Sequence, residues 1–280
     1  MRTRVLRLAS GPEKVIAMNK PLISKWPLKK IVNHRIIQEE ESIAREVPLT
    51  VILNGQEFAT LVCSPADVRE LAVGFLASEG VIRTIEDVQS MSINENQGFI
   101  YVELKNPQPI APSDMSKRLI GSCCGKSRQF YFKTDAATAK TVMSKTKITQ
   151  EQCFRLMKAL NARSEIFFET GGVHNAALCH PDKIIAARTD IGRHNALDKL
   201  FGYILTNQLN VKDCVIAFSG RISSEVLLKV SKMGIGILLS KSAPTDLALK
   251  TAVDLNITVA GFIRESKMNV YTHSDRIICQ

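Results

Sequence analysis

The second half of the chain alternates short apolar runs with longer amphipathic stretches. The apolar runs CVIAF, IGILL and ITVAGF lie at residues 214–218, 235–239 and 257–262, and they have the length of strands buried on both faces. The stretches between them repeat apolar residues every three or four positions, which predicts helices. Because these connections are too long for hairpins and crossovers are right-handed, we expect the three strands to run parallel. Two more strands are predicted upstream, EIFFE at 165–169 and KIIAA at 183–187.

The first half has a different pattern, in which short strands are separated by tight turns. Asn54-Gly55 stands between two such strands and favours the positive φ angles of a type I′ hairpin turn. A helix is predicted to begin at Ser64-Pro65, because serine is a good N-cap and proline suits the first helical position. The predicted strands are residues 49–53, 57–63, 87–94 and 98–104. This order predicts a small α+β region.

Charge and proline divide the chain further. Residues 1–45 carry most of the local excess of positive charge, and Pro12, Pro21 and Pro27 interrupt any helix there. We predict an irregular arm, either solvated or ordered on a partner. The stretch NPQPIAPSD at 106–114 contains three prolines and marks a boundary. The expected organisation is a basic irregular arm at 1–45, a smaller α+β region at 46–115 and a larger α/β domain at 116–280.

The composition narrows the class of protein. The 280 residues carry a formal net charge of +10, so we expect an anionic partner: nucleic acid, a phosphorylated small molecule or an acidic protein face. No apolar run approaches the roughly 20 residues of a membrane-spanning helix, and the N-terminus lacks the apolar core of a secretory signal. The seven cysteines are scattered and form no paired CxxC set, which argues against a disulfide framework or a structural zinc site. We expect a reducing cytoplasm, no membrane partner and no permanently bound metal.

The parallel order has a consequence for binding, because ligands of such sheets lie at the carboxyl ends of the strands. The loops Ser219–Ser223, Ser240–Thr245 and Phe262–Lys267 leave those ends. Two of the loops open helices, whose free N–H groups favour anions. Cationic side chains add to this crevice, namely Arg221, Lys241, Arg264 and Lys267. The pattern predicts a site for phosphate groups, although neither a Walker nor a GxGxxG sequence is present.

Two histidines and a charged cluster are further candidates. His174 follows two glycines and His194 follows DIGR; each either binds a metal or moves protons, or is a hydrogen-bonded structural residue. The sequence argues against a zinc deaminase, because His174 does not begin an H-x-E motif and the chain has no PCxxC. The charged cluster is either an ion-pair network or a set of ligand clamps, and it consists of Arg188, Asp190, Arg193 and Asp198.

Two adjacent thiols stand in the glycine-containing, cationic segment LIGSCCGKSRQF at 119–130. Lys126 and Arg128 would lower the pKa of Cys124, and the thiolate is the nucleophilic form of cysteine. Adjacent cysteines such as Cys123 and Cys124 seldom form a disulfide, because the ring is strained. The pair is therefore either a reactive site or an incidental surface feature. The cysteines that lie in apolar runs are predicted to be small core residues.

Six segments carry long and specific motifs. They are VPLTVILNGQEFATLVCSPADVRELAVGFLASEGVI (47–82), FETGGVHNAAL (168–178), RTDIGRHNALDKLFG (188–202), SGRISSEVLLKVSKMGI (219–235), SKSAPTDLALKTA (240–252) and GFIRESKMNVYTH (261–273). Together these segments resemble the FdhD family. The resemblance implies a cytoplasmic sulfurtransferase that formate dehydrogenase requires, and that takes persulfide sulfur from a cysteine desulfurase.

The same resemblance implies a ligand, an assembly and a fold. The ligand is the molybdenum bis(molybdopterin guanine dinucleotide) cofactor, bound as a substrate, and the assembly is a homodimer. The larger domain of the family resembles the cytidine deaminase fold without its zinc site. This agrees with the α/β class predicted from the residues, a mixed or parallel sheet with flanking helices beside a smaller N-terminal α+β domain.

The resemblance also assigns site residues. The commoner family pattern is S-C-G-x-C-G, and its first cysteine matches Cys124 while its second matches Ser127. Cys124 is therefore the expected persulfide carrier, and Cys123 is a candidate relay or resolving thiol. The expected cofactor-binding residues are Phe262, Ile263, Arg264, Glu265, Ser266 and Lys267 from the family, and Ser219, Arg221, Ser240, Lys241, His174 and His194 from the crevice.

An alternative function is a cofactor-binding chaperone for formate dehydrogenase that performs no sulfur chemistry. Nucleic acid is not an expected partner, because no basic face interleaved with aromatic residues supports it.

Overall fold

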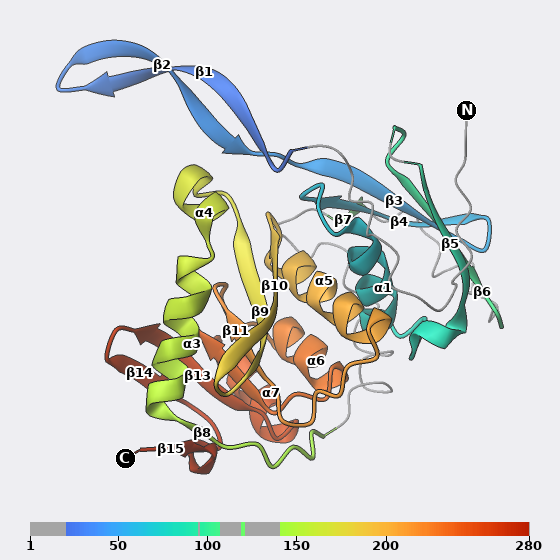
Figure 1. Cartoon of the computed structure of the whole chain (residues 1–280), viewed down its shortest axis with the longest axis vertical. Helices are drawn as coiled ribbons and strands as arrows, with labels where there is room; N and C mark the ends of the chain where they lie inside the picture. The colour runs from blue at the N-terminus through green and yellow to red at the C-terminus, as the bar shows by residue number, and fades with distance from the viewer. Residues whose placement is uncertain (1–20, 95, 107–118, 121–140, 280) are drawn as a thin grey trace.

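The computed structural model describes residues 21–94, 96–106, 119–120 and 141–279. Its larger sheet has six strands in the order β10-β9-β11-β12-β13-β14 (Figure 1). The three central strands β11, β12 and β13 are parallel, as predicted. β9 and β10 form an antiparallel hairpin, and β14 runs antiparallel to β13, so the sheet is mixed. The strands are β9 (His174–His180), β10 (Lys183–Asp190), β11 (Val215–Phe218), β12 (Ile237–Ser240), β13 (Thr258–Arg264) and β14 (Lys267–Val270).

Helices cover both faces of this sheet. On one face, Leu156 of α3 belongs to the same buried cluster as Val215 and Ala217 of β11. The alternate β11 residues, Ile216 and Phe218, belong to the cluster that α5, α6 and α7 cover on the other face. Burial on both faces explains why CVIAF is a continuous apolar run. The helices are α3 (Gln150–Ala162), α5 (Arg193–Thr206), α6 (Ser224–Lys232) and α7 (Asp246–Asp254).

One predicted strand is wrong. Residues 165–169 belong to α4 (Glu165–Thr170), a short helix that ends at Gly171 in the left-handed conformation. Phe167 and Phe168 are exposed on it, so the aromatic content that suggested a strand has no sheet to bury it. The Ser164 hydroxyl donates to the Leu160 carbonyl at 2.9 Å and closes α3 directly before α4. The predicted strand at 183–187 is confirmed and continues to the end of β10.

A second sheet of five strands, in the order β5-β6-β3-β4-β7, forms from the first half of the chain. Asn54 and Gly55 both have positive φ angles and turn β3 into β4, as predicted. α1 (Val68–Ser78) begins after Asp67 rather than at Ser64-Pro65, because the Ser64 hydroxyl accepts from the Ile191 N–H instead of capping the helix. The remaining elements are β3 (Val47–Leu53), β4 (Gln56–Cys63), η1 (Ile85–Asp87), β5 (Val88–Asn94), β6 (Phe99–Leu104) and β7 (Leu119–Ile120).

Helices α1 and α5 join the two sheets. One hydrophobic cluster contains both Leu49 of the first half and Leu238 of the second. Where the helices cross, a Cβ added to Gly74 would lie 1.8 Å from the backbone oxygen of Asp198. Gly202 meets the opposite helix at a similar distance, 1.9 Å. The smaller region and the larger sheet therefore share one core.

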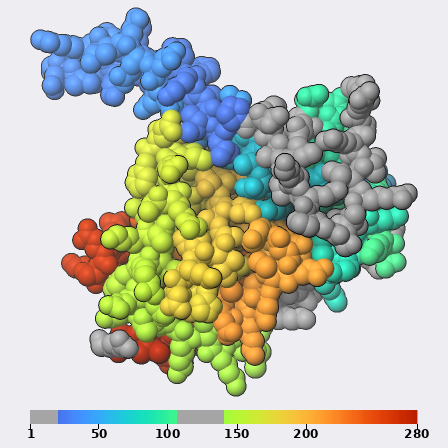
Figure 2. All heavy atoms as spheres, viewed as in Figure 1, coloured from blue at the N-terminus to red at the C-terminus, as the bar shows by residue number. Residues whose placement is uncertain are grey.

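The described part of the predicted arm is not irregular. β1 (Ile23–Val32) and β2 (Arg35–Ala44) form an antiparallel hairpin that extends away from the rest of the molecule, in blue in Figures 1 and 2. Pro27 excludes a helix but is compatible with β1, which is an edge strand. Asn33 and His34 both have positive φ angles and form a hairpin turn that was not predicted. Residues 1–20 lie outside the described residues.

The chain ends beside the start of α3. β15 (Ile277–Ile278) follows η3 (Ser274–Arg276) and pairs in parallel with β8 (Ile148–Thr149), which leads into α3. Among the described residues, no helix is long and apolar enough to cross a membrane.

Candidate functional site

The predicted crevice edge is present in the fold. β11 and β12 end at Phe218 and Ser240, and their loops lead into α6 and α7. The start of β9 and the end of β10 lie at the same edge, because β9 runs antiparallel to β11. Backbone hydrogen bonds hold the loops together: the Lys241 N–H donates to the Phe218 carbonyl at 3.2 Å, and the Phe262 N–H donates to the Ser242 carbonyl at 3.3 Å.

The two helices that begin at this edge are capped by their own residues. The Ser223 hydroxyl accepts from the Val226 N–H at 3.4 Å at the start of α6. The Thr245 hydroxyl accepts from the Ala248 N–H at 3.3 Å at the start of α7. The first turns also carry acidic residues, Glu225 in α6 among them, which reduce the attraction for an anion. Most of the positive charge of the edge must come from side chains.

A cavity of about 840 Å³ lies between α3 and the turn that joins β13 to β14. Arg155, Lys158, Lys241 and Arg264 line it, against the single carboxylate of Glu265. The Arg155 guanidinium also bonds to an acid outside the lining set, Asp182, at 3.3 Å. The excess of cations favours an anionic ligand. The other lining residues are Phe154, Met157, Asn161, Ile263 and Ser266.

One cationic side chain of the cavity and the turn beside it are held by specific contacts. The Lys241 ammonium group donates to the Asn161 amide oxygen at 2.7 Å, so the two sides of the cavity are joined across it. At the turn, Phe262 and Glu265 both have positive φ angles, which are uncommon for residues other than glycine. A side chain on the preceding Gly261 would lie 2.9 Å from the Ser242 carbonyl oxygen. The turn is therefore fixed in a strained shape beside the cavity.

Four residues of the predicted stretch 262–267 line this cavity, and two do not. Ile263, Arg264, Glu265 and Ser266 are lining residues, whereas Phe262 and Lys267 are exposed outside the lining set. Sequence reasoning missed the opposite wall, formed by α3. The relevant pattern was available, because Arg155, Lys158 and Asn161 repeat every three residues along one face of that helix.

The predicted serines shape the loops of the edge. Ser240 is fully buried; its hydroxyl donates to the Gly220 carbonyl at 2.8 Å and accepts from the Ser242 N–H at 3.0 Å. The Ser219 hydroxyl accepts from the Asn175 N–H at 2.9 Å. The Ser240 hydroxyl thus both donates and accepts within the loops, whereas the Ser219 hydroxyl accepts one bond and keeps its O–H donor for another partner. Arg221 is exposed at the same edge but does not line the cavity.

Both histidines lie at the edge, outside the lining set of the cavity. His174 begins β9 and is half-buried. Burial, followed by the nearby Arg193 guanidinium, lowers the pKa of His174, and this favours its neutral form at neutral pH. His194 lies in the first turn of α5, with its Nε2 3.2 Å from a carboxylate oxygen of Glu225.

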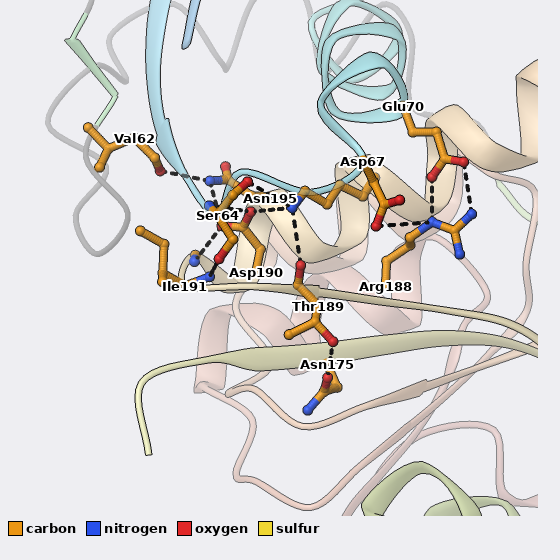
Figure 3. Close-up of polar contacts among 12 residues, drawn as sticks. Val62, Ser64, Asp67, Glu70, Asn175, Arg188, Thr189, Asp190, Ile191 and Asn195 are labelled. Carbon is orange, nitrogen blue, oxygen red and sulfur yellow. Dashed lines mark hydrogen bonds and ion pairs between the residues drawn. The ribbon is translucent and has the colours of Figure 1, made fainter. Parts of the chain in front are cut away.

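The charged cluster of residues 188–198 contains ion pairs, which favours a network over ligand clamps. Arg188 bonds to Glu70, Asp190 lies 2.7 Å from the Lys199 ammonium, and Asp198 pairs with Lys229. Figure 3 shows the pair of Arg188 and Glu70, and the Asp190 carboxylate of the second pair. Lys199 was not predicted, although it occupies an apolar position of the helical repeat around Ala196 and Leu200.

The two candidate thiols, Cys123 and Cys124, lie outside the described residues, as do Lys126, Ser127 and Arg128. The last described residues before them are Leu119 and Ile120 of β7, which pair with Thr60 and Leu61 of β4. The four other cysteines that lie in apolar runs are buried, as predicted, and Cys279 is exposed; the buried ones are Cys63, Cys153, Cys179 and Cys214. Burial raises the pKa of the first three to about 12, so these three thiols stay protonated at neutral pH.

Comparisons with known proteins place the chain in a family. The pattern of the FdhD/NarQ family matches residues 44–278. A protein of Halalkalibacterium halodurans named sulfur carrier protein FdhD is 57% identical over 263 residues, which are 93% of this chain and 97% of that protein. A protein of the same name from Bacillus subtilis is 56% identical over 242 residues, 86% of this chain and 92% of the relative.

A solved structure shares the fold. It is a crystal structure from Desulfotalea psychrophila, described as that of a formate dehydrogenase accessory protein. The alignment has a TM-score of 0.76 at 24% identity and covers 92% of this chain and all of the other. The near full-length matches in sequence and the shared architecture agree with each other. This chain belongs to the FdhD/NarQ family.

Proposed function

We propose that this chain is a cytoplasmic sulfur carrier that serves formate dehydrogenase. The observation that carries the proposal is its similarity over nearly its full length to proteins named sulfur carrier protein FdhD. The cationic cavity at the sheet edge supports the proposal, because a carrier that serves a nucleotide-containing cofactor needs a site for phosphate groups.

The first chemical step is the loading of Cys124. Its thiolate attacks the outer sulfur of a persulfide on a cysteine desulfurase, and a new S–S bond forms as the donor's S–S bond breaks. The donor cysteine leaves as a thiolate, and the outer sulfur keeps its proton or releases it to water. No net electron transfer occurs. Lys126 and Arg128 are close in sequence and would favour the thiolate form of Cys124.

The second step delivers this sulfur. Release of the outer sulfur as sulfide requires two electrons, which a thiol co-reactant supplies as it becomes a disulfide with the carrier sulfur. The candidate for this thiol is a small molecule, because a disulfide between the adjacent Cys123 and Cys124 would be strained. Cys123 is instead a candidate relay, whose thiolate takes the outer sulfur as its own persulfide while Cys124 leaves as a thiolate. The sulfide would then exchange with an oxygen ligand of the molybdenum cofactor in its bis(molybdopterin guanine dinucleotide) form, which is the substrate. The metal–oxygen bond breaks as the metal–sulfur bond forms, and the oxygen leaves as water with the two protons of the sulfide.

The cavity fits one nucleotide arm of that substrate. Its volume of about 840 Å³ falls within the usual range of small-molecule sites. Lys241 and Arg264 both line it, across from α3, where each could meet a phosphate oxygen. The strained turn at Phe262 and Glu265 supports a binding role, since such backbone is retained mainly at functional sites.

We extend the proposal to the partners and the fold. The partners are a cysteine desulfurase, formate dehydrogenase and a second copy of the chain in a homodimer. The larger sheet is interpreted as cytidine deaminase-like without a zinc site. A mixed sheet whose first two strands form a hairpin and whose central strands run parallel supports this interpretation.

The carrier assignment is tested by three single substitutions. Cys124→Ala, Cys123→Ala and, as a matched control, Cys279→Ala are incubated with a cysteine desulfurase and radiolabelled cysteine. We expect Cys124→Ala to lose the protein-bound label and Cys279→Ala to keep it, because Cys279 is exposed but remote in sequence from the cationic segment. Full labelling of Cys124→Ala together with normal activation of formate dehydrogenase would show that another group carries the sulfur.

A cofactor-binding chaperone without sulfur chemistry is the second candidate. It is favoured by Ser127, which stands where the commoner family pattern has its second cysteine. A chaperone with Cys124→Ala would still activate formate dehydrogenase, whereas a chaperone with Lys241→Ala would not. A sulfur carrier that uses the cavity would lose activity with both.

A further inference from the structure

A second group of charges, outside the cavity lining, connects the two halves of the molecule. Asp190 at the end of β10 and Lys199 in α5 are both fully buried, and their charged atoms lie 2.7 Å apart. The Lys199 ammonium group also donates to the Ser64 carbonyl at 3.3 Å and to the Thr189 carbonyl at 3.1 Å. All three of its N–H donors are thus used, and the whole side chain is buried.

The Asp190 carboxylate is equally well satisfied. One oxygen accepts from the Ser64 N–H at 3.0 Å and from Lys199. The other accepts from the Gly192 N–H at 2.8 Å and from the Asn195 amide at 2.9 Å. Asn195 also donates to the Val62 carbonyl at 2.9 Å. The network therefore fixes the end of β4 to the turn between β10 and α5.

On one side, this network holds the strand that leads toward the thiols. β4 pairs in parallel with β7, which ends at Ile120, three positions before Cys123. The residue that follows β4 is Ser64, which is bonded through its N–H, its hydroxyl and its carbonyl to the network. The position of β7 therefore depends on how β4 is held.

On the other side, the network holds the edge of the large sheet. Asp190 is the strand partner of His174, and the Thr189 hydroxyl donates to the Asn175 amide oxygen at 2.5 Å. Asn175 in turn bonds to Ser219, in the first loop of the crevice edge. A continuous set of hydrogen bonds thus runs from β4 to that edge.

Stability alone is a weak reason for such a network. A buried ion pair loses most of its Coulomb energy to desolvation, and its replacement by uncharged groups of similar size is often neutral. What a fully satisfied buried network does provide is a unique relative position of the segments that it joins.

We propose that Asp190 and Lys199, with Ser64 and Asn195, are positioning residues that fix the strand pair β4–β7 relative to the ligand edge. This inference rests on the proposed function. The network sets the geometry of sulfur delivery, in which two bound groups must meet, and leaves loading from an external donor unaffected. Misplacement by about 1 Å can lower the rate of such a step by about 100-fold.

The chain offers a matched control for this proposal. Asp198 and Lys229 form an ion pair that is also buried, and the same Asp198 oxygen accepts from the Ser78 hydroxyl at 2.6 Å. That pair joins α5 to α6 and α1, and among the described residues its hydrogen bonds do not reach β4. The test variant is Lys199→Met with Asp190→Asn, and the control variant is Lys229→Met with Asp198→Asn.

Four measurements are made on each full-length variant. The first is sulfur loading by a cysteine desulfurase, measured as a mass gain of one sulfur atom, and the second is binding of inorganic pyrophosphate as a probe of the cavity. The third is delivery, measured as activation of sulfur-free formate dehydrogenase by preloaded protein. The fourth is hydrogen exchange at residues 60–64 and 119–120. For the test variant we expect loading and pyrophosphate affinity within about twofold of wild type, delivery about 10- to 100-fold slower and faster exchange in both segments. The folded control variant should deliver at the wild-type rate.

Each outcome decides the proposal. Wild-type delivery by the folded test variant, or equal loss in the folded control variant, overturns it. If the test variant does not fold, Ser64→Ala decides, since it removes only the bond from Ile191 to the Ser64 hydroxyl. If Ser64→Ala delivers sulfur at least about threefold more slowly than wild type and loads normally, the proposal is supported. If Ser64→Ala delivers sulfur at the wild-type rate, the proposal is overturned. If wild-type protein gains no sulfur at all, the proposed function fails instead, and the two failures are distinguished.

Discussion

The crossing of α1 and α5 predicts a large effect of a very small substitution. Gly74→Ala adds one methyl group, and its carbon would lie 1.8 Å from the Asp198 backbone oxygen. An ordinary contact begins near 3.4 Å, so the helices would have to separate by about 1.6 Å at this point. The obstacle is backbone on an opposing helix, which cannot rotate away as a side chain can. If α5 is displaced, the Asp198 carboxylate moves as well, and its ion pair with Lys229 is disturbed.

The expected magnitude follows from two opposing contributions. Overpacking of a well-packed interface costs about 3 kcal/mol at the upper end of the usual range. Replacement of a helical glycine by alanine stabilises the helix by about 1 kcal/mol, because alanine has the higher helix propensity. The net loss in the free energy of unfolding is therefore about 2 kcal/mol or more. For a chain of this size, that lowers the melting temperature by roughly 4–8 °C.

The assay is thermal unfolding followed by circular dichroism, with urea unfolding to obtain the free energy. Lys250→Ala is the control, because Lys250 is exposed on α7 and its truncation should change stability by less than about 0.5 kcal/mol. A melting temperature of Gly74→Ala within about 1 °C of wild type would refute the reasoning. It would mean that the two helices do not approach each other as closely as described.

Three further predictions concern the cavity, His174 and the cysteines. Lys241→Ala should weaken pyrophosphate binding about tenfold, since a charged donor is lost from the cavity; Lys250→Ala should not, and calorimetry distinguishes them. The pKa of His174 is lowered in the folded state from its ordinary value of 6.5. The contribution of neutral His174 to stability is therefore present above pH 6.5 and is lost as the pH falls below 6.5. His174→Gln should therefore lose less stability than wild type between pH 7.5 and pH 5.5, and parallel pH dependence in urea unfolding would contradict this. At pH 8, iodoacetamide should modify Cys279 rapidly and leave Cys63, whose pKa is about 12, unmodified in the folded protein; equal labelling in a peptide map would contradict the burial of Cys63.

The sequence predicts the parallel centre of the large sheet well, for a physical reason. Strands buried on both faces need apolar residues at every position, and helices between them need a repeat of three or four, so the two patterns alternate visibly. The Asn54-Gly55 turn is equally clear, because few dipeptides accept two positive φ angles. These features depend on local chemistry.

The features that the sequence does not predict depend on distant partners. Ser64 has the chemistry of a helix cap, yet its hydroxyl bonds to Ile191, and α1 begins after Asp67. The cavity wall on α3 becomes part of a site only because the turn at Glu265 folds opposite to it. The hairpin at residues 23–44 was missed because its turn, Asn33-His34, lacks the usual glycine.

The continuous core determines how the protein unfolds. Neither half can withdraw from the other without exposing the apolar faces of α1 and α5 to water, so we expect cooperative loss of both sheets rather than stepwise melting. A fragment that begins at residue 141 would retain α5 with its partner helix missing, and such a truncated chain should aggregate rather than refold.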